Sequence, residues 1–257
     1  MKILVIGDVT SAGGIAHLEK NLWKFRSSEN IDLCIVNAEN AGFITGASPE
    51  AAERLLGAGA DCLTGGNHTL RNHATHGYID SQENMLRPIN FGDTAPGSGY
   101  VILDVSGYRV MVISAMGNVG ITPTLDSPFG YIDRLLSREE GRYDVAVLDI
   151  HAEATGEKLA IAHAYDGKIS VIYGTHTHVP TADEQILPHG SGYITDVGMC
   201  GESGGILGMD VESTVLRMRT HLTPRFTAAA GKPIADGAIF TLDPSSGAVS
   251  EVRRIKF

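Results

Sequence analysis

Short apolar runs alternate with helix-like segments along the first third of the chain. The runs at residues 3–6, 33–36 and 62–64 are continuous rather than alternating, which is typical of strands buried on both faces of a sheet. Between them, residues 15–25 carry apolar side chains at a helical period, and Ser48-Pro49-Glu50 predicts a helix start, with Ser at the cap, for a helix running to about Gly57. This alternation predicts a sheet covered by helices.

The second half of the chain is richer in strands. Residues 100–105 and 109–114 are predicted to form a hairpin that turns at Ser106-Gly107, and the run 145–150 leads straight into His151. Residues 193–195, 238–242 and 252–255 are expected to complete a second sheet, and residues 117–127 are a candidate loop over a cleft. The whole pattern predicts an α/β fold of two packed mixed β-sheets flanked by helices, an αββα sandwich, in one domain spanning residues 1–257.

Composition and charge narrow the class of protein. A chain of 257 residues that is 43% hydrophobic and 19% charged is able to bury a large core. A net charge of -10 argues against duplex nucleic acid or an anionic membrane as partner. The three cysteines are scattered, and the sequence has neither a signal peptide pattern nor an apolar run long enough to span a bilayer. These features predict a cytoplasmic protein without a membrane partner.

Polar residues that can bind metal follow several of the predicted strands. The strand exits carry Asp8, Glu39, Asn40, Asn67, His68, His151, His176 and His178. Because ligands bind outside the carboxyl ends of strands in open α/β sheets, we expect these side chains to converge on one crevice. The pair His176 and His178 is spaced i, i+2, a spacing that points both imidazoles the same way if the backbone is extended.

Each of these residues also has an ordinary interpretation. Asp8 suits a helix cap, Asn67 suits a turn, and His151 suits a residue that is merely hydrogen bonded. The ordinary interpretation is plausible for any single residue, but it becomes improbable for five strand exits together. Carboxylate, amide and imidazole donors without thiolate favour Fe(II), Mn(II), Co(II) or Zn(II). Seven candidate ligands are more than a single tetrahedral ion can bind. The pattern therefore favours two ions that share a bridging carboxylate, the arrangement that phosphatases and nucleases use.

These blocks resemble those of the calcineurin-like metallophosphoesterases. Gly7-Asp8, Glu39-Asn40, Gly66-Asn67-His68, His151 and the run 174–178 follow the order of that superfamily. Within that superfamily, the amino-acid sequences of four segments are similar to those of the YmdB-type branch, which resembles 2′,3′-cyclic nucleotide phosphodiesterases. The segments are residues 37–41, 151–155, 174–183 and 193–199. The resemblance covers nearly the whole chain.

The resemblance implies a role for each strand-exit residue. It implies that one ion is held by Asp8, Glu39, Asn40 and His178, and the other by Glu39, Asn67, His151 and His176. It implies that His68 is the proton donor. The two divalent ions implied are iron or manganese, with zinc or cobalt as alternatives.

Two single positions and two short stretches depart from the sequence expected for this family. Thr10 stands where the wider superfamily has a histidine, and Glu39 stands where it usually has a bridging aspartate. Residues 11–14 stand where the YmdB-type branch often has a Pro-Gly-Arg run, and residues 69–72 stand where a Trp-Asp pair is expected. The last two stretches flank the site, so they put substrate preference in question more than metal binding.

The expected activity is hydrolysis of phosphodiester bonds in small nucleotides, above all 2′,3′-cyclic nucleotides, by a metal-activated hydroxide with His68 as general acid. One alternative is a phosphomonoesterase or nucleotidase with the same dimetal site, and another is a regulatory protein that binds nucleotide or RNA with little turnover. We also expect a homo-oligomer. The residues that contact substrate stay open, with Arg87, Lys158 and Arg225 as candidates for a phosphate or a partner subunit.

Overall fold

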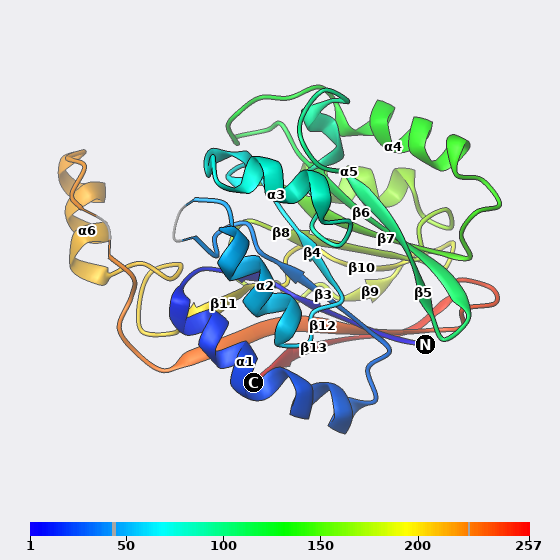
Figure 1. The fold of residues 1–257 in the computed structure, drawn as a ribbon, viewed down its shortest axis with the longest axis horizontal. Coiled ribbons are helices and arrows are strands. Elements are labelled where there is room, and N and C mark those ends of the chain that lie inside the picture. The colour runs from blue at the N-terminus through cyan, green and yellow to red at the C-terminus, as the bar shows by residue number, and fades with distance from the viewer. Residues whose placement is uncertain (43–44, 226) are drawn as a thin grey trace.

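The computed structural model describes residues 1–42, 45–225 and 227–257. It contains two β-sheets (Figure 1). The first has the order β2 (Asp8–Val9), β11 (Met199–Glu202), β12 (Pro233–Leu242), β1 (Lys2–Ile6), β3 (Leu33–Asn37) and β4 (Cys62–Thr64), with β13 (Val249–Lys256) also paired to β12. The second has the order β5 (Tyr100–Val105), β6 (Tyr108–Met116), β7 (Val145–His151), β8 (Val171–Thr175), β10 (Gly192–Ile194) and β9 (Gln185–Ile186).

The helices lie outside the two sheets. They are α1 (Ala12–Glu29), α2 (Pro49–Gly57), α3 (Thr75–Ser81), α4 (Pro128–Arg138), α5 (Thr155–Ala164) and α6 (Val211–Thr220), with short 3-10 turns η1 (Thr69–Arg71) and η2 (Ile89–Phe91). Three apolar layers follow from this order. One packs α1 and α2 on the first sheet, one fills the space between the sheets, and one packs α4 and α5 on the second sheet. The predicted αββα architecture is confirmed.

Parallel pairing brings the carboxyl ends of several strands to the same edge. In the first sheet β1 runs parallel to β3, and β3 runs parallel to β4. In the second sheet β6, β7, β8 and β10 are all parallel. Since polar residues follow directly on β3, β4, β7 and β8, this topology places them on one edge of the sandwich.

The placement of the last two strands corrects a prediction. The runs 238–242 and 252–255 do form strands, but they belong to the first sheet, where β12 lies antiparallel to β1 with Leu4 opposite Ile239. Apolar alternation identifies a strand without identifying its neighbour, and this pairing joins residues more than 200 positions apart.

Local signals set the helix starts. Ser48 caps α2 as predicted, its Oγ accepting a hydrogen bond from the backbone N–H of Ala51 at 3.1 Å. Ser11 caps α1 in the same way through the N–H of Gly14, so α1 is longer than the apolar period alone indicated. Helix α6 stands apart from the two-sheet body in Figure 1. None of the helices in the described residues is long and apolar enough to cross a bilayer.

Candidate metal centre

The strand exits converge as predicted. Asp8 begins β2, Glu39 and Asn40 follow β3, Asn67 and His68 follow β4, His151 ends β7, and His176 and His178 follow β8. Direct contacts between these side chains join the edges of both sheets. The exposed fractions of Asp8, Glu39 and His151 are 0%, 1% and 0%, so these three form the buried base of the site.

One group of donor atoms gathers around His151 Nε2. Asn67 Oδ1 and His176 Nδ1 each lie 3.1 Å from this nitrogen, and Glu39 Oε1 lies 3.6 Å from it. Gly66 allows this approach, since a Cβ there would stand 2.3 Å from the His151 ring. Donors that share one ion at about 2.1 Å lie about 3.0 to 3.4 Å apart, so these spacings suit the edges of a coordination shell.

A second group of donor atoms gathers around His178 Nε2. Asp8 Oδ1 lies 3.6 Å from it and Asn40 Nδ2 lies 3.3 Å from it. The other carboxylate oxygen of Asp8 accepts the backbone N–H of His176 at 3.0 Å. Asn40 turns its amide nitrogen, not its oxygen, toward His178, so its predicted role as a ligand requires the amide to rotate and stays a prediction.

A buried network behind His151 fixes which of its nitrogens carries hydrogen. Thr175 Oγ1 donates to Asp149 Oδ1 at 2.8 Å, so it accepts from His151 Nδ1 at 2.9 Å. Asn37 Nδ2 donates to the other oxygen of Asp149. Burial raises the pKa of Asp149 to about 7, against the lowering effect of its hydrogen bonds from Thr64, Asn37 and Thr175. With its proton on Nδ1, His151 presents the lone pair of Nε2 to the site.

The other two imidazoles also place one ring nitrogen toward the site. His176 Nδ1 lies 3.1 Å from His151 Nε2, and its Nε2 lies 3.2 Å from Glu153 Oε2. His178 Nδ1 donates to the backbone carbonyl of Leu207 at 3.0 Å, and its Nε2 faces Asp8. Against the lowering effect of burial, the nearby Asp8 carboxylate raises the pKa of His178 to about 9. His151 therefore directs a lone pair into the site, and a cation bound beside His178 would take the place of the proton on its Nε2.

Unpartnered buried oxygens test whether cations fit this centre. Among the described side chains, Asp8 Oδ1 and Glu39 Oε1 are buried without a hydrogen bond. Burial raises the pKa of each carboxyl group, but the charges of His178 and His151 reverse this for Asp8, and the charges of His151 and His68 reverse it for Glu39. Carboxylates and imidazole lone pairs that face one another need a cation between them.

The donors are drawn together in pairs rather than around one point. Within residues 1–42, 45–225 and 227–257, no group of three or more His, Cys, Asp or Glu side chains is already gathered around a position for an ion. The physical argument still favours a metal centre, because in each group a buried carboxylate oxygen without a hydrogen bond lies within 3.6 Å of an imidazole nitrogen. The residues present therefore fit divalent metal.

His68 occupies the rim beside both groups. Its Nδ1 lies 2.9 Å from Asn40 Oδ1 and 2.8 Å from Glu39 Oε1, the latter outside hydrogen-bond geometry. Its backbone N–H donates to Glu39 Oε2 at 2.8 Å. Its side chain lines a cavity of about 320 Å³ together with Thr10, Asn40, Glu153, His176, Thr177, His178, Leu207 and Met209. With Nδ1 engaged by acceptors, Nε2 is the nitrogen available to a substrate.

The backbone at the His-Thr-His segment corrects another prediction. Strand β8 ends at Thr175, and His176 and His178 have φ of 99° and 63°, so neither residue is extended. Both imidazoles still reach the site because a turn, not a strand, presents them. An ion pair fully buried beneath this turn supports it. Lys158 Nζ bonds both Asp196 Oδ2 and the carbonyl of Thr175 at 2.8 Å.

That ion pair shows that Lys158 is not available for substrate. Arg87 is also excluded from the metal site, because its buried guanidinium donates to carbonyls within residues 88–96. Arg225 is exposed in the segment that follows α6. Asp149, Thr175, Asn37 and Asp196 were not singled out from the sequence. For Asp149 the signal was an ionisable residue inside the continuous apolar run Val145–His151.

A turn from the second half of the chain covers the metal site. Residues 206–209 form the turn, bridged between Ile206 and Met209. Gly208, at φ 84°, packs on Thr10 so closely that a Cβ would stand 2.8 Å from Thr10 Oγ1. Thr10, where a histidine was the expected residue, thus seats this turn. Leu207 and Met209 supply the apolar part of the cavity wall.

Comparisons with known proteins agree with this geometry. The family model described as "YmdB-like protein" matches residues 4–255. A relative named 2′,3′-cyclic-nucleotide 2′-phosphodiesterase, from Bacillus subtilis (strain 168), is 39% identical over 99% of this chain and 96% of its own length. A crystal structure of a hypothetical protein from Thermus thermophilus has a TM-score of 0.92 at 36% identity, covering 100% of this chain and 99% of that one.

Two further solved structures extend the comparison. One titled as a novel phosphatase from Mycoplasma pneumoniae has a TM-score of 0.92 at 31% identity, covering 100% of this chain and 93% of that one. The calcineurin-like phosphoesterase YfkN from Bacillus subtilis has a TM-score of 0.54 at 12% identity, covering 100% of this chain and 90% of that one, which shows a shared fold alone.

Proposed function

The chain belongs to the YmdB-like family, and we propose that it is a metal-dependent phosphodiesterase that opens 2′,3′-cyclic nucleotides. The observation that carries the proposal is the gathering of imidazole nitrogens, an amide oxygen and unpartnered carboxylate oxygens into two neighbouring groups beside His68. The name of the Bacillus subtilis relative supplies the substrate class and points to the 2′ ester bond.

The proposed metal content is two divalent ions, iron or manganese, with zinc or cobalt as alternatives. Asp8, Asn40 and His178 would hold one ion, Asn67, His151 and His176 the other, and Glu39 both. Bound divalent cations supply activation of a water molecule and neutralisation of charge on the phosphoryl oxygens.

The chain's own groups carry out the rest of the reaction. Asp149 and Thr175 hold His151 in the tautomer that a cation needs, and the Glu153 carboxylate lies 3.2 Å from His176 Nε2. His68 lines the cavity beside Glu39 and Asn40, from which its Nε2 can deliver a proton to the leaving 2′ oxygen. The turn at residues 206–209 shields this region from solvent on one side.

Product analysis of the purified protein tests the proposal. Incubation with 2′,3′-cyclic AMP should yield 3′-AMP by chromatography, whereas 3′,5′-cyclic AMP should be hydrolysed at a much lower rate. A chelator should abolish turnover, and Mn²⁺ or Fe²⁺ should restore it, with two metal equivalents per chain by elemental analysis. Release of 2′-AMP would contradict the assigned ester bond, and full turnover in chelator would contradict the metal centre.

A phosphomonoesterase is the second candidate, because the solved Mycoplasma pneumoniae relative is titled a phosphatase. Parallel assays on bis- and mono-nitrophenyl phosphate separate the two activities, and the diesterase proposal requires the faster rate on the diester. Cyclic nucleotide that binds without turnover in a metal-loaded sample would favour the regulatory alternative. Homo-oligomerisation stays a prediction that light scattering tests.

A further inference from the structure

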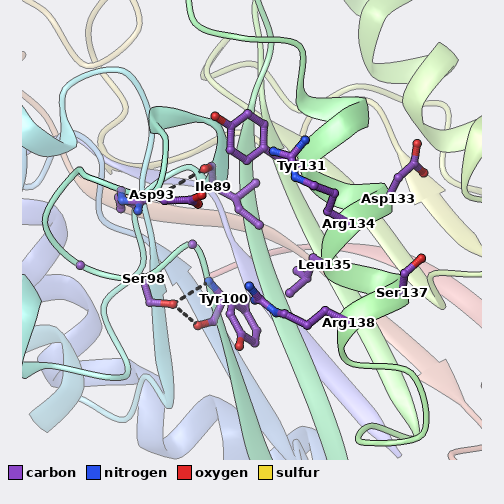
Figure 2. A pocket seen from close by; sticks show the side chains of 13 residues that line it. Ile89, Asp93, Ser98, Tyr100, Tyr131, Asp133, Arg134, Leu135, Ser137 and Arg138 are labelled. Carbon is purple, nitrogen blue, oxygen red and sulfur yellow. Dashed lines mark hydrogen bonds between the residues drawn. The ribbon is translucent and has the colours of Figure 1, made fainter.

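A second cavity lies away from the metal centre, between α4 and the segment 87–100. Its volume is about 930 Å³, within the range of about 300–1,000 Å³ usual for small-molecule sites. Figure 2 shows the side chains that line it. Those with chemical interest are Arg87, Asp93, Tyr100, Tyr131, Arg134 and Arg138. None of these residues contributes to the metal-centre cavity.

Two arginines of α4 extend from successive turns toward this cavity. Arg134 lies over the ring of Tyr131 at 4.4 Å, and Arg138 lies over the ring of Tyr100 at 5.2 Å. Stacking on a ring holds a guanidinium flat and leaves the N–H groups at its edge free to donate. Arg138 also donates to Glu139 at 2.9 Å. The two stacked pairs lie one above the other along α4 in Figure 2.

A third guanidinium lies at the wall of the cavity. Arg87 is 5% exposed and donates to the backbone carbonyls of Pro88, Ile89, Gly92, Ala95 and Pro96. Within the described part of the chain, no carboxylate pairs directly with this cation. Carbonyl dipoles satisfy its N–H groups without cancelling its charge, and burial lets that charge act over a longer range than in water.

The acidic residues of the cavity offset only part of this charge. Asp133 points to the other side of α4 in Figure 2, where it accepts the Tyr165 hydroxyl at 3.1 Å. Asp93 and Asp80 are the carboxylates whose charges act on Arg87. Glu139 pairs with Arg138 at 2.9 Å, so of the two stacked arginines only Arg134 is without an ion pair among the described residues. The cavity is a local site for an anion.

The apolar and aromatic parts of the wall indicate more than a bare anion. Ile89, Leu135 and the two tyrosines form a surface on which a flat ring can lie, and a guanidinium plane is itself a stacking partner for a nucleobase. We propose that this cavity is a second binding site, for a mononucleotide, with its phosphate on Arg134 and Arg138 and its base against the tyrosine–arginine layers. This site does not depend on the function proposed for the metal centre.

Photo-crosslinking of the metal-loaded protein locates the bound nucleotide. With 8-azido-AMP, crosslinked peptides should map to residues 87–100 or 128–138, and competition with 5′-AMP should remove them. The double variant Arg134→Ala/Arg138→Ala should lose at least about tenfold in crosslinking efficiency at a fixed probe concentration. The matched control Arg109→Ala, an exposed arginine of β6 that pairs with Asp144, should crosslink like the parent protein.

Calorimetry separates a nucleotide site from a simple anion site. We expect 5′-AMP to bind at least about tenfold more tightly than inorganic phosphate or adenosine alone. The double variant Arg134→Lys/Arg138→Lys, which keeps charge but loses the flat guanidinium, should retain phosphate binding and lose the preference for 5′-AMP. Crosslinks confined to metal-centre peptides, equal affinities for phosphate and 5′-AMP, or unchanged binding in a folded alanine variant would each overturn the proposal.

Discussion

The two sides of the metal centre are built in different ways. The base, formed by Asp8, Glu39 and His151, lies at strand ends and is at most 1% exposed. The cover, formed by residues 206–209, is an irregular turn in which Leu207 is 46% exposed and has φ of 54°. The base is held by two sheets and a buried hydrogen-bond network, whereas the cover is tied to the site through the Leu207 carbonyl and the packing of Gly208 on Thr10.

This difference separates two tasks of the site. Side chains fixed by buried strands keep their geometry under substitution elsewhere, since strand register and core packing determine their position. A turn on the surface tolerates changes in sequence at lower cost. We therefore propose that the base sets the chemistry and the cover sets the fit of substrate, and the variants below test that division in order of decreasing effect.

Replacing His68 separates catalysis from metal binding. The His68→Ala variant keeps both carboxylates of the site and the imidazoles of His151, His176 and His178, so the amount of bound metal should be unchanged. Turnover of 2′,3′-cyclic AMP should fall by about 10²–10⁴, the usual contribution of a positioned general acid. Steady-state kinetics with parallel elemental analysis measures both quantities.

His73→Ala is the matched control for that variant, because His73 lies in the same loop region and is exposed. It should leave turnover and metal content as they are. A His68→Ala protein that loses its metal together with its activity would show that His68 is a ligand rather than an acid.

Breaking the buried ion pair between Lys158 and Asp196 tests how much this pair stabilises the protein beneath the metal centre. Lys158→Met leaves Asp196 buried without its cation, and the free energy of unfolding should fall by about 3–5 kcal/mol. Urea denaturation measures it. Arg109→Met, which breaks the exposed pair with Asp144, should have a much smaller effect. Similar losses in both variants would mean that the buried pair does not support the turn at 175–178.

The residues of the base were largely predictable from the sequence, but the buried residues that hold them in place were not. A polar residue straight after a buried run is a local signal, so Asp8, Glu39 and His151 could be identified without a partner in view. Asp149 and Thr175 act through contacts between strands, and only the parallel pairing of β7 with β8 brings them together. The turn at His176 and His178 escaped prediction for a related reason, since Lys158 and Asp196 hold it from distant segments.

Removing the hydroxyl that links Asp149 to His151 tests the role of this support. Thr175→Val keeps the shape of the side chain but leaves His151 Nδ1 without its acceptor, so the metal-binding tautomer is no longer fixed. Metal affinity should fall by about 10–100-fold, as for other groups that orient a ligand. Competition with a chromogenic chelator measures it. Thr175→Ser should restore the affinity, and failure of that rescue would contradict the tautomer argument.

The cover was not predicted, because nothing local in residues 206–209 indicates contact with residue 10. Thr10 was interpreted from the sequence only as a missing histidine. The structure shows that a small side chain at this position leaves room for Gly208 and so brings Leu207 and Met209 to the cavity. A departure from the expected ligand pattern is here the reason that a distant segment reaches the site.

Shortening Leu207 should produce the smallest effect and affect substrate fit alone. Leu207→Ala keeps the carbonyl that accepts from His178, so the base should retain its metal and kcat should stay within about twofold. Loss of apolar contact should raise KM for 2′,3′-cyclic AMP about fivefold, equivalent to about 1 kcal/mol of side-chain burial. Leu216→Ala, on the exposed part of α6, is the control and should behave like the parent protein. A fall in kcat or in metal content would show that cover and base act as one unit, because the same turn would then control both substrate fit and the ligand geometry of His178.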